Sequence, residues 1–150
     1  MTTQRQLPIC IPAARPLVPL EAIMVLLDID EDSVLGLIDA GELRWAWNIA
    51  SSGADRREIR VLRDSLLSYC ALSGQPADAA ALWPIVFGHS RDVVRSTELQ
   101  RLFSCSSSHV HRLIKDKDLV ALNAATTGPN GYARITRASV IGFLNSRRMT

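Results

Sequence analysis

The chain has 150 residues, of which 47% are hydrophobic, and a chain of this size buries roughly two-thirds of its unfolded surface, enough to fold without a metal or disulfide staple. Its cysteines, Cys10, Cys70 and Cys105, are far apart and lack CxxC spacing, which argues against a disulfide framework or a cysteine-rich zinc site and favours a reducing cytoplasm. The net charge of +2 divides into −3 for residues 1–75 (seven basic, ten acidic) and +5 for residues 76–150 (ten basic, five acidic), so an anionic partner is expected to meet the second half.

Prolines interrupt the start of the chain. Pro8, Pro12, Pro16 and Pro19 leave no apolar run long enough for a signal peptide or a membrane span. We expect residues 1–17 to form an extended arm and the protein to have no membrane partner.

An internal repeat organises the remainder of the chain. Residues 18–43 align with residues 94–119 at a constant offset of 76, which places apolar on apolar residues, for example Val34 on Val110 and Leu37 on Leu113. Residues 60–69 align with residues 134–143 at an offset of 74, so the change of offset falls in the loop between the two blocks. We therefore expect two copies of one unit, at 18–72 and 93–150, joined by a linker over 73–92.

Each copy has the same predicted order of elements. A short helix (20–27 or 97–103) is followed by a tight turn and a second helix, for which Asp30 or Ser106 is the expected N-cap. Two short strands come next, at 43–50 with 58–62 and at 119–124 with 132–136, and then a closing helix, at 64–72 or 138–145. A further helix over 77–86 is expected in the linker. Trp45 and Trp47 alternate with Leu43 and Ile49 along the strand at 43–50, which predicts that all four share one buried face. The fold class predicted is mainly α with small β-hairpins (α+β).

The second copy resembles a known family. Its segment Cys105-Ser-Ser-Ser-His-Val-His-Arg-Leu-Ile114, with Arg134-Ile135, Arg137 and Val140-Ile141 downstream, is similar to the excisionase-like and MerR-like winged helix-turn-helix group of DNA-binding proteins. The resemblance implies tandem winged helix-turn-helix units of which the first is degenerate. It also implies that the second helix enters the major groove of double-stranded DNA while the hairpin lies along neighbouring phosphates.

The residue types in this segment suit such a contact. With Val110, Leu113 and Ile114 turned inward, helical geometry turns polar and basic side chains outward, where they can donate to base edges or phosphates. The predicted DNA-binding residues are Ser106, Ser107, Ser108, His109, His111, Arg112, Lys115, Lys117, Arg134 and Arg137. Cys105, His109 and His111 suggest a metal site only weakly, because Cys105 aligns with the core residue Ile29 and no fourth ligand is evident, so neither a metal nor another cofactor is expected.

The first copy keeps the core positions and replaces this surface. Where the second copy has Ser106, Ser107 and Ser108, the first has Asp30, Glu31 and Asp32, and residues 28–42 contain six acids and no Lys or Arg. Phosphates would repel such a helix, so the first copy is not expected to read bases. Its acids Asp30, Glu31 and Asp32 form either a protein-docking surface or a merely solvated face. Leu35 stands where the family has an outward aromatic, and it is either part of that docking surface or partly covered by the linker helix. Four arginines of its hairpin, Arg44, Arg56, Arg57 and Arg60, either touch the DNA backbone or pair with the acidic helix.

No motif for catalysis is present, since the sequence contains no glycine-rich phosphate loop, HExxH-like spacing or Ser/His/Asp arrangement, and we expect a non-enzyme. The preferred hypothesis is a small bacterial transcription regulator that binds specific DNA sequences. It would be cytoplasmic and associated with the nucleoid, with a possible homodimer or protein contact through the first copy. Two alternatives remain open: an excisionase-type recombination directionality factor, and a protein-interaction adaptor or antiactivator that uses the fold without DNA.

Overall fold

The computed structural model describes residues 15–70, 79–122 and 133–149, so most of the expected arm, the start of the linker and most of the second hairpin loop lie outside the described residues. The described residues form seven helices and two small antiparallel sheets, a mixture of helix and strand that is compatible with the expected α+β class. None of the helices within these ranges is long and apolar enough to cross a membrane.

The first copy runs from β1 to α3. Its elements are β1 (Leu17–Pro19), α1 (Leu20–Leu27), α2 (Glu31–Asp39), β2 (Ala46–Asn48), β3 (Ile59–Leu62) and α3 (Arg63–Tyr69). The strands form a three-stranded sheet in the order β1-β3-β2. Leu17, assigned above to the arm, is the first residue of β1 and is fully buried.

The second copy follows the helix α4 (Ala79–Phe87), which takes the place of the expected linker helix. Its elements are β4 (Val93–Arg95), α5 (Ser96–Phe103), α6 (Ser107–Lys115), β5 (Arg134–Thr136) and α7 (Arg137–Arg147). β4 pairs with β5, and the hairpin partner expected over 119–124 is reduced, within the described residues, to an isolated bridge between Ala121 and Ile135.

The two copies share their backbone geometry in detail. Val18 pairs with Val61 in the first sheet, and their counterparts Val94 and Ile135 pair in the second. Both copies end the first helix on a left-handed residue, Asp28 (φ 54°) or Ser104 (φ 48°). The first residue of the closing helix donates its N–H across the unit in both copies, over 2.7 Å, from Arg63 to the Pro16 carbonyl and from Arg137 to that of Asp92. The sequence repeat is therefore also a structural repeat.

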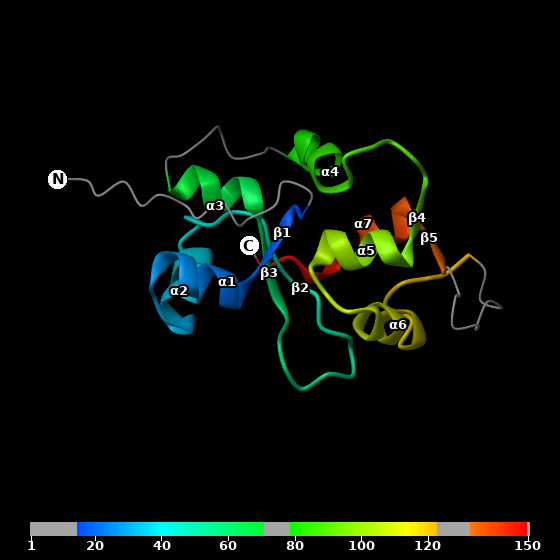
Figure 1. The fold of residues 1–150 in the computed structure, drawn as a ribbon, viewed down its shortest axis with the longest axis horizontal. Coiled ribbons are helices and arrows are strands. Elements are labelled where there is room, and N and C mark those ends of the chain that lie inside the picture. Colours follow the sequence, from blue (N-terminus) through cyan, green and yellow to red (C-terminus); the bar gives the residue numbers. More distant parts are fainter. Residues whose placement is uncertain (1–14, 71–78, 123–132, 150) are drawn as a thin grey trace.

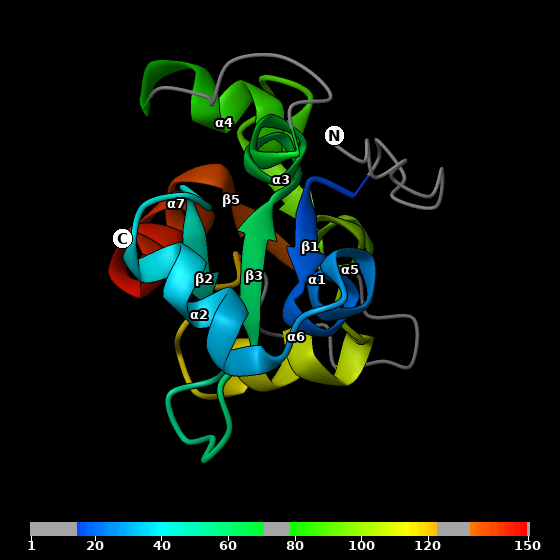
Figure 2. The same ribbon diagram turned by 90° about the vertical axis from the view of Figure 1, so that its left-hand side faces the viewer.

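The sheet of the first copy separates two hydrophobic clusters. Val18, Ala46 and Val61 face α1 and α2 of their own copy. Leu17, Trp47 and Leu62, which alternate with them, face α4 and the second copy. In Figure 2, α1 and α2 lie in front of the sheet, while α5, α6 and α7 lie behind it. The second copy thus completes its core on the sheet of the first.

The residues in and beside β2 make the sheet face toward the second copy strongly apolar. Trp45, Trp47 and Ile49 are buried in the shared cluster, and the expectation that they belong to the core is confirmed. Leu43 instead packs in the first copy's own cluster, because the left-handed backbone at Trp45 (φ 65°) breaks the strand alternation before β2. After α7, Met149 donates its N–H to the Ala46 carbonyl over 2.8 Å, which attaches the end of the second copy to the edge strand β2.

Candidate nucleic-acid interface

The helix α6 is built so that its polar side faces outward. The Ser106 hydroxyl caps its start by accepting the His109 N–H over 3.2 Å, as expected for an N-cap. Val110 and Leu113 are buried and Ile114 is half-buried. The exposed residues from the cap to the end of the helix are Ser106, Ser107, Ser108, His111, Arg112 and Lys115. The structure thus brings six of the ten predicted DNA-binding residues together on one surface.

Lys117 follows α6 in a backbone conformation that favours glycine. Its φ is 63°, and its counterpart in the first copy, Gly41, has φ 76°. The hydrogen bonds around them also correspond: Lys117 donates to the Ile114 carbonyl over 3.1 Å, and Gly41 to that of Ile38 over 3.0 Å. A side chain in this region costs about 1 kcal/mol relative to glycine. The exposed lysine is therefore held at a strained position that the sister copy fills with glycine.

The remaining three predicted residues lie outside the exposed surface of α6. The His109 ring is half-buried, and its Nε2 lies 2.7 Å from the Ile49 carbonyl oxygen of the first copy. Arg137 donates to the His89 carbonyl over 2.6 Å and lies 4.5 Å from the centre of the Phe87 ring. Both side chains thus connect parts of this chain. Arg134 is exposed on β5, beside Arg95 of β4.

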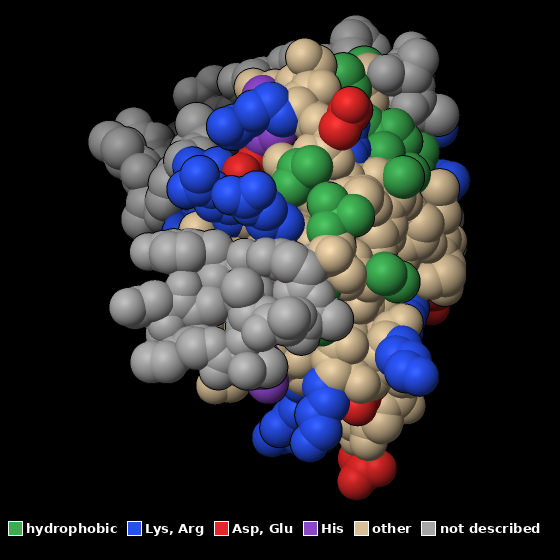
Figure 3. Space-filling view, turned by 90° about the vertical axis from the view of Figure 1, so that its right-hand side faces the viewer, with side chains coloured by type: hydrophobic (Ala, Val, Ile, Leu, Met, Phe, Trp, Pro, Cys, Tyr) green, Lys and Arg blue, Asp and Glu red, His purple; other side chains and the backbone are tan. Residues whose placement is uncertain are grey.

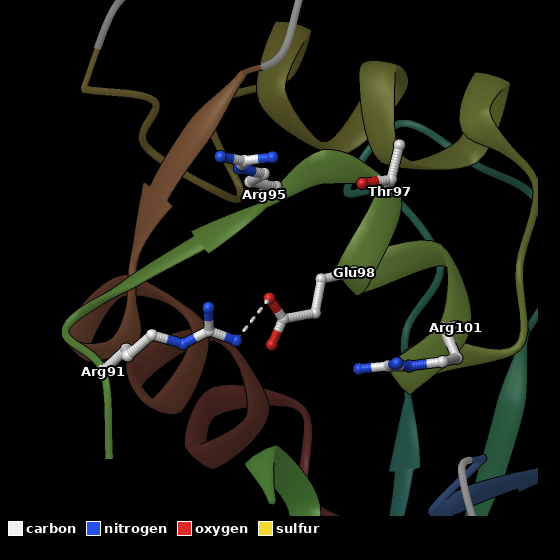
Figure 4. Close-up of a pocket in the computed structure, with 5 residues that line it drawn as sticks. All are labelled: Arg91, Arg95, Thr97, Glu98 and Arg101. Carbon is white, nitrogen blue, oxygen red and sulfur yellow. Dashed lines mark ion pairs between the residues drawn. The ribbon is translucent and has the colours of Figure 1, made fainter. Parts of the chain in front are cut away.

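A basic cleft adjoins α6 and was not anticipated from the sequence. It has a volume of about 240 Å³ and is lined by Arg91, Arg95, Thr97, Glu98 and Arg101, from β4, α5 and the segment before them (Figure 4). Glu98 pairs with His89 and, over 3.7 Å, with Arg91. The guanidinium groups of Arg95 and Arg101 have no hydrogen-bond or ion-pair partner within the described ranges. Three arginines against one carboxylate leave the cleft with a charge of +2.

The repeat contains the signal that could have revealed this cleft. At an offset of 76, Arg95, Thr97 and Arg101 correspond to Pro19, Glu21 and Val25 of the first copy. Val25 is 83% exposed, so its position on α1, like that of Arg101 on α5, faces solvent. Comparing the exposed positions of the copies, and not only their cores, separates basic from non-basic surface.

The corresponding surface of the first copy is acidic. Asp30 caps α2 by accepting the Ser33 N–H over 2.8 Å, and Glu31 and Asp32 are exposed beside it. Hydrogen bonds from the Ser33 side chain and its backbone N–H hold the pKa of Asp30 below its ordinary value, so this carboxylate stays charged at neutral pH. Leu35, for which a partner contact or cover by the linker helix was considered, is half-buried against the core of its own copy.

The four hairpin arginines of the first copy have three different environments. Arg60 is only 6% exposed and donates to the carbonyls of Phe103 and Ser104 at the end of α5, over 2.7 and 3.0 Å. Its buried guanidinium group therefore cannot reach a DNA phosphate, and it does not pair with the acidic helix α2. Neither of the two roles considered above applies to Arg60. Arg44 lies 5.2 Å from the centre of the Trp45 ring. Arg56 and Arg57 are exposed in the β2–β3 loop.

The two charge surfaces lie at opposite ends of the molecule. Figure 1 places α2 at the left and α6 at the lower right, with the sheet of the first copy between them. On the face that carries β4, β5 and α6, Lys and Arg side chains gather in two groups, one at the upper left and one towards the bottom (Figure 3). An anionic partner would therefore be attracted to the end that carries α6.

Cys105 directly precedes the N-cap of α6 and is half-buried against the hydrophobic cluster that the copies share. Burial raises the pKa of its thiol to about 11, with the nearby Arg60 opposing the shift. Within the part of the chain that the structure describes, no three His, Cys, Asp or Glu side chains gather closely enough to hold a metal ion.

Comparison with known proteins adds no neighbour: no family model, no curated protein and no solved structure matches this chain.

Proposed function

We propose that this protein binds double-stranded DNA through its second copy, with α6 in the major groove, as a small sequence-specific transcription regulator built from two winged helix-turn-helix units. In this proposal Ser107, His111 and Arg112 approach base edges, because they lie on the exposed side of α6. Lys115 and Lys117 approach phosphates beside the groove.

One observation carries the proposal: two copies with corresponding backbones differ in the charge of the same exposed positions. The pairs Glu31/Ser107, Gly36/Arg112, Gly41/Lys117 and Val25/Arg101 lie at equivalent places on α2/α6, on the turn after these helices and on α1/α5. A fold that needed basic residues for its own stability would need them in both copies. Their confinement to one copy supports a role in binding an anion.

The basic cleft supports a nucleic-acid backbone as that anion. Its lining residues are all polar or charged, and the lining exposes more polar than apolar surface, which suits an anion better than the organic part of a metabolite. A phosphodiester needs only the charge and the hydrogen-bond donors that Arg95, Thr97 and Arg101 supply. The cleft therefore extends the proposed contact from α6 to the phosphates alongside.

Anisotropy of labelled genomic duplexes, titrated with the purified protein at several salt concentrations, tests the proposal. Arg112→Ala with Lys115→Ala is expected to abolish specific binding, whereas Asp32→Ala, on the corresponding helix of the first copy, should leave it intact or strengthen it. Lys117→Gly introduces the residue that the first copy has at this position. It removes a proposed phosphate contact and relieves the left-handed backbone, so binding should weaken while the melting temperature stays the same or rises. Equal losses from the α6 pair and from Asp32→Ala would refute the division between the copies.

A regulator and a recombination directionality factor would both pass this test. They differ in what happens to the DNA, since the second class bends or bridges its site beside an integrase. Circular permutation of the bound site in a gel measures the bend. A wild-type protein with no salt-dependent affinity for any duplex would favour the adaptor hypothesis.

A further inference from the structure

The β2–β3 loop of the first copy, residues 49–58, runs alongside α6 of the second copy. Near the start of α6, the His109 ring Nε2 donates to the Ile49 carbonyl over 2.7 Å, since only a ring N–H can bond to a carbonyl oxygen. Beyond the end of α6, Asp118 Oδ2 accepts the Ser52 N–H over 2.9 Å. The loop is therefore fixed to the proposed DNA-reading helix on both sides of its exposed surface.

Further hydrogen bonds support the position of the loop. Asp118 Oδ1 accepts a bond from Arg147 of α7 over 3.0 Å, so this carboxylate joins the loop to the closing helix as well. At the base of the loop, Asn48 Oδ1 accepts the N–H groups of Ala50 and Glu58, over 3.1 and 3.0 Å, and closes the two sides onto each other. The loop thus has a fixed base and a fixed side, both of which determine where its far end lies.

The far end of the loop carries unpaired positive charge. Arg56 and Arg57 are exposed, and neither guanidinium has a hydrogen-bond or ion-pair partner among the described residues. Asp55 is the acid beside them, while Glu58 pairs with Arg60 over 3.5 Å. The acidic helix α2, the other candidate partner for these arginines, lies on the opposite side of the sheet, whereas the loop extends from the lower edge of the molecule, beside α6 (Figures 1 and 2).

We propose that the β2–β3 loop of the first copy serves as a wing for the reading helix of the second, with Arg56 and Arg57 contacting the phosphate backbone of the duplex that α6 reads. The inference rests on the proposed function, because it needs α6 to bind DNA. It assigns the first copy a part in the DNA site that its acidic helix cannot play. It also gives His109 the role of a positioning residue, which holds the loop against α6 instead of touching a base.

In this proposal the loop recognises the negative charge of the DNA backbone and not the sequence of the bases. Two flexible guanidinium groups outside the groove meet phosphate oxygens and carry no information on bases. Removing two phosphate contacts should lower the salt slope of log K by about 1.8, which corresponds to a loss of about 60-fold in affinity at 0.1 M salt relative to 1 M. Specific and non-specific duplexes should lose the same factor.

The experiment compares Arg56→Ala/Arg57→Ala with Arg15→Ala/Arg148→Ala in the full chain, by anisotropy against log salt on one labelled duplex. The control removes the same charge from two exposed arginines that lie neither on the loop nor on α6. Ethylation interference on the same duplex gives a local readout: phosphates whose ethylation blocks the wild type should become tolerant in the loop variant alone. Thermal melting verifies that each variant is folded.

Three outcomes are distinguishable. The expected one is a lower salt slope and a local loss of phosphate interference for the loop variant, with the control near the wild type. If the wild type binds, Arg112→Ala/Lys115→Ala abolishes binding and the loop variant matches the control, the wing is overturned while the proposed function stands. If the wild type binds no duplex, the proposed function itself fails and the wing with it.

Discussion

Replacing Arg60 tests how the two copies are held together. It lies in β3 of the first copy, on the face of the sheet that carries Trp47, and its side chain is buried. Its Nε and Nη2 donate to the carbonyls of Phe103 and Ser104, two of the groups at the end of α5 that have no partner within the helix, and its Nη1 donates to its own strand at Ile59 over 3.0 Å. Arg60→Ala removes all three bonds.

The size of the effect follows from the two bonds between the copies. Hydrogen bonds from a charged donor contribute about 1.5–3 kcal/mol each, and part of this is offset because the alanine variant no longer has to desolvate a guanidinium group. We expect a loss of about 3 kcal/mol in the free energy of unfolding. With a urea m-value of about 2 kcal/mol/M, the midpoint should fall by about 1.5 M.

Urea denaturation followed by tryptophan fluorescence is the assay, because Trp45 and Trp47 report from the cluster shared by the copies. The repeat supplies the matched control: Arg134 occupies the same register position in the second sheet and is exposed, so Arg134→Ala should change stability by less than about 0.5 kcal/mol. Arg60→Lys should recover only part of the loss, since an ammonium group cannot reproduce the forked geometry. If Arg60→Ala unfolds at the wild-type midpoint, or if both alanine variants lose equally, the role assigned to this residue is wrong.

Two further predictions concern the interior. In a Cys10→Ser/Cys70→Ser variant, Cys105 should react with a disulfide reagent at pH 8 about 100-fold more slowly than an ordinary thiol, because its pKa is raised to about 11 from 9.0 and the thiolate is the reacting form. The rate should rise as the pH approaches 11; a rate at pH 8 equal to that of a free thiol would contradict the burial. A fragment of residues 79–150 should show no cooperative thermal transition by circular dichroism, because it lacks the sheet face that includes Trp47 and Leu62. A sharp transition in the fragment would show that the second copy can bury its helices alone.

The sequence predicted the local elements well for a physical reason. The helices α1 and α5 begin and end close to the expected residues, and the N-caps Asp30 and Ser106 act as predicted. Apolar spacing and a capping side chain are properties of a few consecutive residues, so they can be recognised without knowledge of the fold. β1 and β4 were missed because each has only three residues and forms through pairing with a strand that lies some forty residues away.

The same distinction explains the candidate site. Ser107, Arg112 and Lys115 are exposed as helical periodicity predicts. His109 and Arg137 are held by the carbonyls of Ile49 and His89, and Arg60 by those of Phe103 and Ser104. A backbone carbonyl has no signature in the sequence, because every residue carries one. Whether a basic side chain meets such a group or solvent depends on packing between distant segments.

The shared core also bears on why the first copy keeps its fold although its α2 surface is acidic. If each copy were a closed domain, the first could lose stability without consequence for the second. Here the sheet that carries Trp47 covers the second copy, Arg60 caps α5, and the loop that follows Asn48 lies along α6. Mutations in the buried residues of the first copy therefore alter the position of α6, whereas mutations on the exposed face of α2 do not. The acidic helix is accordingly the part of the first copy that is free to diverge, and its core and β2–β3 loop are the parts that the proposed DNA site constrains.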